Sequence, residues 1–126
     1  MSYDWNKYLE FADVLYNEPM SFDAQTLSRN IISRAYYAAH NIARILKYSI
    51  DRVQLKDDRD KHYKVINFFS SYDHTQGTNI ADSLDSLRKK RGQVDYDENI
   101  NFSLPDASLA LLTAQDAIEE MSRHTG

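Results

Sequence analysis

The residues best suited to chemistry lie in the segment 87–96, which reads Leu-Arg-Lys-Lys-Arg-Gly-Gln-Val-Asp-Tyr. Four consecutive cations end a helix-like apolar pattern, and a carboxylate (Asp95) and a phenol (Tyr96) follow about one turn after Arg91. The chain has a net charge of −4, so we interpret this local positive charge as a contact for a phosphate-bearing partner. The alternative is a solvated helix end, where cations are favourable at the negative pole of the helix.

Three further candidates lie outside this segment. Tyr37 and His40 belong to a long helical pattern, and either could face Arg91 across a cleft; tyrosines at helical spacing are also usual in a core or a dimer interface. His62 precedes a short apolar-patterned segment. It could supply a histidine to the Arg91 cluster in space, or it could be a surface or capping residue near a helix start.

Other chemistries lack their residues. The chain has no cysteine, and its four histidines show no metal-ligand spacing, so we expect neither a disulfide framework nor a metal site. No glycine-rich phosphate loop, dinucleotide fingerprint or nucleophile elbow is present, and we expect no cofactor. An enzymatic function therefore depends on the Arg91 cluster.

Length and composition predict one soluble domain over 1–126. The 126 residues are 42% hydrophobic and 27% charged, and only 3 glycines and 2 prolines favour long helices over a turn-rich β fold. A pI near 5.5 argues against a nucleic-acid binder that uses its whole surface. No signal peptide or apolar run of membrane-spanning length is visible, and we expect a cytoplasmic protein that does not enter a membrane.

Apolar spacing predicts an all-α, up-and-down bundle of about five helices. The first contains Trp5 to Leu15, with Asp4 as a cap, and ends before Pro19. The second spans 21–49, with Ser21 or Asp23 as its cap and small residues that allow a close helix approach. Its apolar stripe consists of Leu27, Ile31, Ile32, Ala35, Ala38, Ala39, Ile42 and Leu46.

The remaining helices are shorter. A charged connector over 51–60 precedes a third helix around 62–69, and a loop over 70–78 leads to a fourth helix that ends at Gly92. After an acidic loop over 94–103, Ser103 and Pro105 open the last helix. One side of this helix is predicted to contain Leu109, Leu112 and Ile118, with Ala110, Ala114, Ala117 and Met121 nearby. Nine tyrosines make self-association a further expectation.

Two segments in this order resemble the HEPN superfamily (higher eukaryotes and prokaryotes nucleotide-binding). They are 33–40, Ser-Arg-Ala-Tyr-Tyr-Ala-Ala-His, and 87–96, with His62 and its neighbours between them. The resemblance is closest to the small stand-alone prokaryotic branch and covers most of the chain. It implies a helical bundle that is commonly a homodimer. Many such proteins are metal-independent ribonucleases, and many are encoded beside a minimal nucleotidyltransferase as a toxin–antitoxin pair.

The family motif is an arginine, four to six residues and a histidine. Arg91 matches the arginine, but Tyr96 stands where the histidine would be, after Asp95. Metal-free RNA cleavage needs a base and an acid, and a phenol with a pKa of about 10 is a poor base at neutral pH. The motif is therefore degenerate, and we predict weak or no ribonuclease turnover.

The resemblance assigns residues to two roles. Arg91, Tyr96 and Asp95 are the candidates for catalysis. The residues predicted to bind RNA or a nucleotide are Arg88, Lys89, Lys90, Arg91, Tyr37, His40 and His62. We expect an RNA- or nucleotide-interacting protein of a toxin–antitoxin or defence module, with a nucleotidyltransferase as a possible partner protein. The alternative is a non-catalytic helical homodimer that docks a partner protein.

Overall fold

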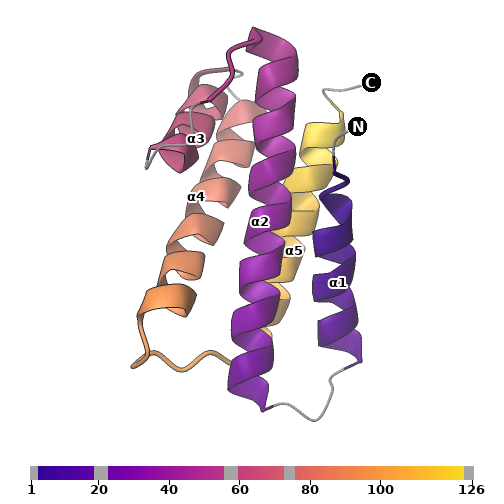
Figure 1. Ribbon diagram of the computed structural model, residues 1–126, viewed down its shortest axis with the longest axis vertical. Helices are drawn as coiled ribbons and strands as arrows, with labels where there is room; N and C mark the ends of the chain where they lie inside the picture. Colours follow the sequence, from indigo (N-terminus) through magenta and orange to yellow (C-terminus); the bar gives the residue numbers. More distant parts are fainter. Residues whose placement is uncertain (1–2, 19–22, 56–59, 73–75, 124–126) are drawn as a thin grey trace.

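The protein is an all-α bundle in the computed structural model, which describes residues 3–18, 23–55, 60–72 and 76–123. Within these ranges there are five helices and no strand: α1 Asn6–Asn17, α2 Ala24–Asp51, α3 Lys61–Tyr72, α4 Gln76–Tyr96 and α5 Leu104–Ser122. Figure 1 shows α1, α2, α4 and α5 running alternately down and up the long axis, with the short α3 beside one end of α4. The predicted fold class is confirmed.

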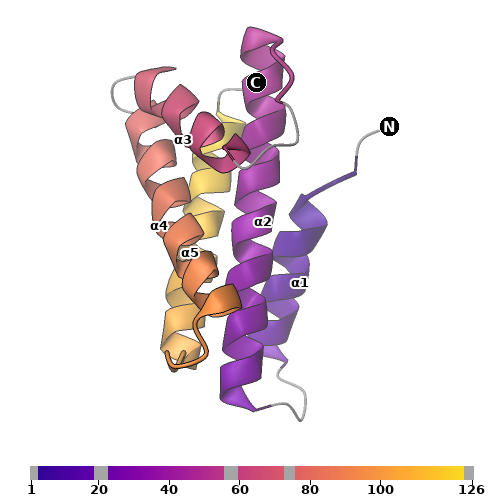
Figure 2. The ribbon, with the colours of Figure 1, turned by 60° about the vertical axis from the view of Figure 1, so that its left-hand side comes forward.

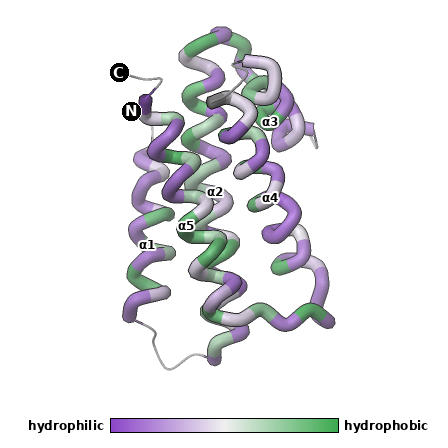
Figure 3. Tube along the Cα trace, turned by 180° about the vertical axis from the view of Figure 1, so that it is seen from behind, coloured by the Kyte–Doolittle hydropathy of each residue, from purple (hydrophilic) through white to green (hydrophobic). Residues whose placement is uncertain are grey.

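Helix α2 is the centre of the bundle because it contacts all four other helices. The view in Figure 2 shows α3 packed across the end of α4 and α2, on the side away from α1. Along the Cα trace, hydrophobic and hydrophilic residues alternate within each helix, as expected for helices that bury one side (Figure 3). No described helix combines the length and the apolar character that crossing a bilayer requires.

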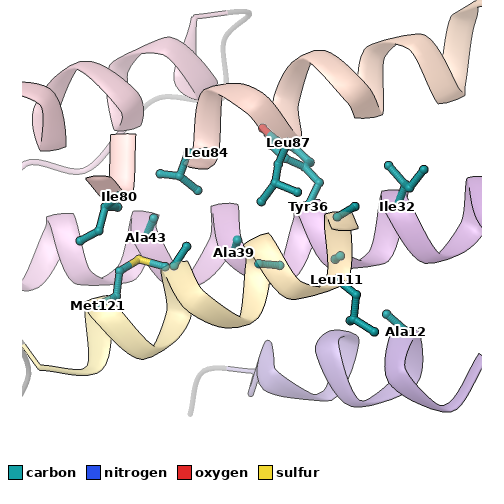
Figure 4. Close-up of a cluster of buried hydrophobic side chains, with 14 of the residues drawn as sticks. Ala12, Ile32, Tyr36, Ala39, Ala43, Ile80, Leu84, Leu87, Leu111 and Met121 are labelled. Atoms are coloured by element: carbon teal, nitrogen blue, oxygen red, sulfur yellow. The ribbon is translucent and has the colours of Figure 1, made fainter. Parts of the chain in front are cut away.

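The core follows the predicted stripe of α2. Every residue of the stripe is buried except Ile42, which is partly buried against the core. Small residues make the centre tight: Ala39 and Ala43 of α2 face α5, while Leu84 and Leu87 of α4 cover the other side (Figure 4). Tyr36 is 1% exposed and lies beside Leu87 in the same cluster. Tyr36 is therefore a core residue.

Two predicted helix starts are confirmed by their caps. The Asp23 carboxylate accepts a hydrogen bond from the backbone N–H of Thr26 at 2.8 Å, which begins α2; the alternative cap, Ser21, lies outside the described residues. Ser103 and Asp106 form a reciprocal capping box at the start of α5, with Pro105 in the first turn. Both caps satisfy backbone donors that a helix start leaves unpaired.

Helix α1 starts one residue later than a cap at Asp4 implies. Asp4 accepts a hydrogen bond from the backbone N–H of Asn6 at 3.1 Å, but Trp5 is the flanking residue and provides no side-chain cap. The predicted inward side is confirmed, because Ala12 is buried and Leu9 packs against the core. The helix ends at Asn17 as predicted, while Pro19 lies outside the described residues.

The prediction that Gly92 ends α4 is wrong, since the helix continues to Tyr96. Val94 is only 7% exposed, and its burial extends the helix past the glycine. Arg29 of α2 then holds the end of α4: its guanidinium donates to the carbonyls of Val94, Asp97 and Ile100. The acidic loop therefore begins only after Tyr96.

Two other sequence expectations are corrected. The predicted loop over 70–78 is shorter, because α3 extends to Tyr72, whose ring stacks on Phe68, and α4 begins at Gln76. On α5, Leu109 and Leu112 are 58% and 54% exposed. Ile118 packs against the core, and the residues that the pattern placed nearby, Ala110, Ala114, Ala117 and Met121, are buried. Ala107 and Leu111 complete the buried side of α5. Close approach to the small residues of α2 selects this alanine-rich side.

Candidate functional site

Three helices bring four predicted site residues together around the buried ring of Tyr36. Tyr37 and His40 come from α2, His62 from the first turn of α3, and Arg91 from the last third of α4. The α3·α4 and α2·α4 contacts position them, because α3 packs across one end of α4 and beside the C-terminal half of α2. Residues separated by more than fifty positions in the sequence therefore form one cluster.

Arg91 is held inside this cluster. Its guanidinium carbon lies 5.4 Å from the ring centroid of Tyr36 and 5.6 Å from that of Tyr37. One terminal nitrogen donates to the Asp95 carboxylate at 3.1 Å, and the Nε atom is buried without a hydrogen-bond partner. The Arg91 side chain is only 14% exposed. These contacts make Arg91 a support for the two tyrosine rings and a source of positive potential behind them.

The two histidines form a close, tilted ring pair beside Tyr36. The ring centroids of His40 and His62 are 4.3 Å apart, and the ring of Tyr36 stacks on that of His40 at 5.6 Å. The Tyr36 hydroxyl makes a short hydrogen bond with Nδ1 of His62. His40 is 4% exposed, whereas His62 is half-buried.

The cluster favours uncharged histidines and an uncharged Tyr36. Burial, then His62 and the cations Arg44, Lys61 and Arg91, lowers the pKa of His40 to about 3. Burial, then Arg91, Lys61 and Arg88, lowers the pKa of His62 below its ordinary value. Burial raises the pKa of Tyr36 against the opposing effect of Arg91. At neutral pH all three rings are neutral, and the positive charge belongs to the surrounding arginines and lysines.

A surface pocket of about 350 Å³ opens beside the histidine pair. Two of its cations, Arg34 and Arg44, make no ion pair with the described residues; Arg34 packs on Tyr8, and Arg44 donates to the Asn41 side chain. No carboxylate is among the described residues that line the pocket. The lining residues are Trp5, Tyr8, Arg34, Tyr37, His40, Asn41, Arg44, Lys61 and His62.

The structure does not bring the four consecutive cations to this pocket. Arg88 pairs with Asp85 and lies over the Tyr63 ring at 4.5 Å. Lys89 is 66% exposed and also pairs with Asp85. Hydrogen bonds with Ser103, and to a smaller extent the charge of Lys90, lower the pKa of Asp106 at the start of α5. Successive helical residues are rotated by about 100°, so the run spreads around α4, and of its four cations Arg91 is the one that packs on the rings of Tyr36 and Tyr37.

Tyr96 is separate from the site. It is 82% exposed and makes no ring contact with the described aromatic residues. Asp95 joins the site only through its ion pair with Arg91. Of the three residues predicted for catalysis, Arg91 and Asp95 form an ion pair, while the Tyr96 side chain has no hydrogen bond or ring contact with the described residues.

Sequence reasoning missed Arg34, Asn41 and Arg44, which line the pocket together with the predicted Tyr37. Arg34, Tyr37, Asn41 and Arg44 recur at i, i+3, i+7 and i+10, which places them on one face of α2. This spacing is visible in the sequence and could have indicated a polar stripe beside the apolar one. Trp5 and Tyr8 carried no such signal, because only the packing of α1 on α2 brings them to the pocket.

Comparisons with models of known protein families, with characterised proteins and with solved structures give no match to this chain. Guanidinium and ammonium groups bind phosphate oxygens, and the aromatic rings offer surfaces on which a nucleobase can stack. Among the described residues, no group of three or more metal-ligating side chains occurs.

Proposed function

We propose that this protein is a HEPN-like module that binds single-stranded RNA or a nucleotide in the pocket between α1, α2 and α3. The observation that carries the proposal is the lining of the pocket, which combines cations with aromatic rings and contains no carboxylate among its described residues. In a chain with a net charge of −4, a pocket of this kind favours a phosphate-bearing ligand over a cationic or apolar one.

The arrangement along α2 fits more than one phosphate. Arg34 and Arg44 are ten residues apart, which corresponds to about 15 Å along the helix axis. Tyr37 and His40 lie between them, with the ring of Tyr8 on the facing helix. A single RNA strand that runs along this face of α2 would place its phosphates near the two arginines and a base against the aromatic rings. Base stacking on an aromatic side chain contributes about 1–3 kcal/mol per base.

The test is binding of a labelled single-stranded RNA at low and high salt. We expect the affinity to fall as salt increases, because phosphate contacts release counterions. The double variant Arg34→Gln/Arg44→Gln should bind about tenfold or more weakly than the wild type at low salt. Arg123→Gln, which removes an exposed cation at the end of α5, is the matched control and should bind normally. No binding by the wild type, or equal binding by the double variant, would contradict the proposal.

The family resemblance extends the proposal to partners. A HEPN-like chain would act as a homodimer in a toxin–antitoxin or defence module, beside a nucleotidyltransferase partner protein. The supporting observations are the confirmed five-helix bundle and the position of Arg91 next to Tyr37 and the two histidines. Co-purification with the product of a neighbouring nucleotidyltransferase gene would test the partner, and an unrelated neighbour would argue against it.

A second candidate function is a non-catalytic helical homodimer that docks a partner protein. Leu109 and Leu112, more than half exposed on the outer side of α5, favour it because a second copy could cover them. Light-scattering molar mass of the wild type and of Leu109→Glu/Leu112→Glu tests this surface. A dimer that dissociates in the double variant, together with no RNA binding by the wild type, would favour this function over the first.

A further inference from the structure

The hydrogen bond between Tyr36 and His62 connects the core to the pocket. Tyr36 is 1% exposed, and the partner of its hydroxyl among the described residues is Nδ1 of His62. A buried phenol O–H without an acceptor costs about as much as a lost hydrogen bond. Since burial raises the pKa of Tyr36, its hydroxyl keeps its proton. The phenol therefore donates to Nδ1.

This direction of donation determines which imidazole nitrogen has the proton. In a neutral histidine one ring nitrogen is a donor and the other an acceptor, and the partner of one sets the role of the other. With Nδ1 accepting from Tyr36, the hydrogen is on Nε2. Nε2 has no partner among the described residues, and it is not one of the buried unpartnered atoms, which are Ser28 Oγ and Arg91 Nε. Because His62 lines the pocket, its Nε2–H is available there.

Two further features hold His62 in this state. Protonation at Nδ1 would force the ring to donate to the Tyr36 oxygen, leaving the buried phenol hydrogen without an acceptor. Among the described residues, the charged groups that face the ring also oppose a second proton, because all of them are cations. The ionisable groups that face His62 are Tyr36 and His40 on α2, Lys61 on α3, and Arg88 and Arg91 on α4.

We propose that Tyr36 is a positioning residue that locks His62 as the neutral Nε2–H tautomer, so that His62 offers a hydrogen-bond donor to a phosphate oxygen in the pocket. The ligand part of this inference rests on the proposed RNA or nucleotide binding. The fixed tautomer also determines whether His62 can act as a hydrogen-bond donor or as a base at the pocket. A ring nitrogen that already bears a proton can donate to phosphate but cannot remove the proton of a 2′-hydroxyl.

The lock is tested first in the free protein. The ¹⁵N chemical shifts of the imidazole nitrogens distinguish the two tautomers, and their pH dependence gives the pKa of His62. We expect the wild type to hold the Nε2–H tautomer. Tyr36→Phe, which removes only the hydroxyl, should give a mixture of tautomers and a higher His62 pKa. Tyr16→Phe removes a hydroxyl at the edge of the core in α1 and should change neither value.

The ligand part is tested with a labelled single-stranded RNA at pH 7.5. His62→Ala should bind about fivefold or more weakly, as expected for one lost hydrogen bond to a charged group. His62→Gln, which can place an N–H in a similar position, should recover most of this loss. Tyr36→Phe should weaken binding by a smaller factor and make it tighten as the pH falls towards 6, since the freed imidazole can then gain a proton.

The possible failures are distinct. An Nδ1–H tautomer in the wild type, or an unchanged tautomer in Tyr36→Phe, would overturn the lock whether or not RNA binds. A confirmed lock with equal RNA affinity in the wild type and His62→Ala would overturn the role of His62 as a phosphate donor. A confirmed lock with no RNA binding by the wild type would overturn that role together with the proposed function.

Discussion

At the scale of single residues, His40 links the site to the stability of the fold. Its pKa is lowered from 6.5 to about 3 by burial and by His62 and nearby cations, so the folded state holds it neutral. The unfolded state binds a proton below pH 6.5 and the folded state does not. Stability is therefore fully present above about pH 6.5 and is lost as the pH falls towards 3.

The wild type should lose about 2 kcal/mol of unfolding free energy through His40 between pH 7 and pH 5. His62 shifts in the same direction and adds to this loss. In His40→Gln the decrease over this range should be smaller by about the same 2 kcal/mol. Urea denaturation at the two pH values measures the difference. An equal decrease in both proteins would show that His40 is protonated in the folded state.

Arg91 should matter more for the cluster than for direct contact with the ligand. Its contacts with two tyrosine rings and Asp95 are together expected to contribute about 1–2 kcal/mol, and Arg91→Ala should destabilise the protein by that amount. Because Arg91 does not line the pocket, its loss should reduce RNA affinity less than the loss of Arg34 and Arg44. A larger loss of affinity in folded Arg91→Ala would place Arg91 in direct contact with the ligand.

The sequence predicted part of the site. Helical spacing and the family resemblance led to Arg91, Tyr37, His40 and His62, and the structure brings these four together. The pocket cations could not be predicted in the same way. The spacing of Arg34 and Arg44 shows that they share one face of α2, but only the packing of α1 and α3 shows that this face lines a pocket. Four consecutive charges were a stronger signal in the sequence, yet a helix disperses them around its axis.

At the scale of helices, the apolar stripe of α2 and two helix starts were predictable, whereas the end of α3 and both ends of α4 were not. The α2 stripe and the caps at Asp23 and Ser103 follow from local sequence, since a capping side chain lies within three residues of its target. The end of α4 depends on Arg29, which is 65 residues from Val94 in the sequence. A contact of that range has no local signature, and Gly92 provided a misleading one.

Removing Arg29 should release the end of α4 and the loop that follows it. Its guanidinium donates to the carbonyls of Val94, Asp97 and Ile100 and lies 5.2 Å from the Phe102 ring. Arg29→Met keeps an apolar stem but leaves these carbonyls without their donor. We expect a loss of about 3 kcal/mol in urea denaturation and faster amide exchange over 94–103.

Arg123→Met is the matched control for this change. Arg123 is 56% exposed, and its ion pairs with Glu119 and Glu120 are near the end of α5. Exposed pairs contribute little, so this variant should stay within about 0.5 kcal/mol of the wild type. Equal stability of the Arg29 and Arg123 variants would mean that the acidic loop does not depend on α2.

At the scale of the whole molecule, few glycines and prolines and the 3.6-residue apolar period were enough to predict the bundle. Which side of α5 faces inward was not predictable, because apolar residues occur all around that helix. Packing against α2 determines which of them are buried. The same packing leaves Tyr96 in solvent while Arg91 lies inside the cluster. The two residues that the family motif pairs are thus separated within one chain.

This separation leads to a prediction about catalysis. We expect no cleavage of a labelled single-stranded RNA above background in the presence of a chelator, although the RNA is bound. Arg91 cannot exchange protons near neutral pH. The nitrogen that His62 offers to the pocket is proposed to have a proton already, and His40, with a pKa lowered to about 3 by burial and nearby cations, is a very weak base. Acid–base assistance is typically worth about 10²–10⁴-fold in rate.

The prediction is tested by comparing RNA cleavage by three proteins: the wild type, Arg91→Ala and Tyr96→His. Tyr96→His restores the histidine of the motif, but at a position that is 82% exposed and away from the pocket, so cleavage should stay at background. Robust wild-type cleavage that Arg91→Ala abolishes would contradict the prediction and assign proton transfer to His62 or His40. Activity gained by Tyr96→His alone would mean that position 96 reaches Arg91 from a second copy of the chain, because within one chain the two side chains do not meet.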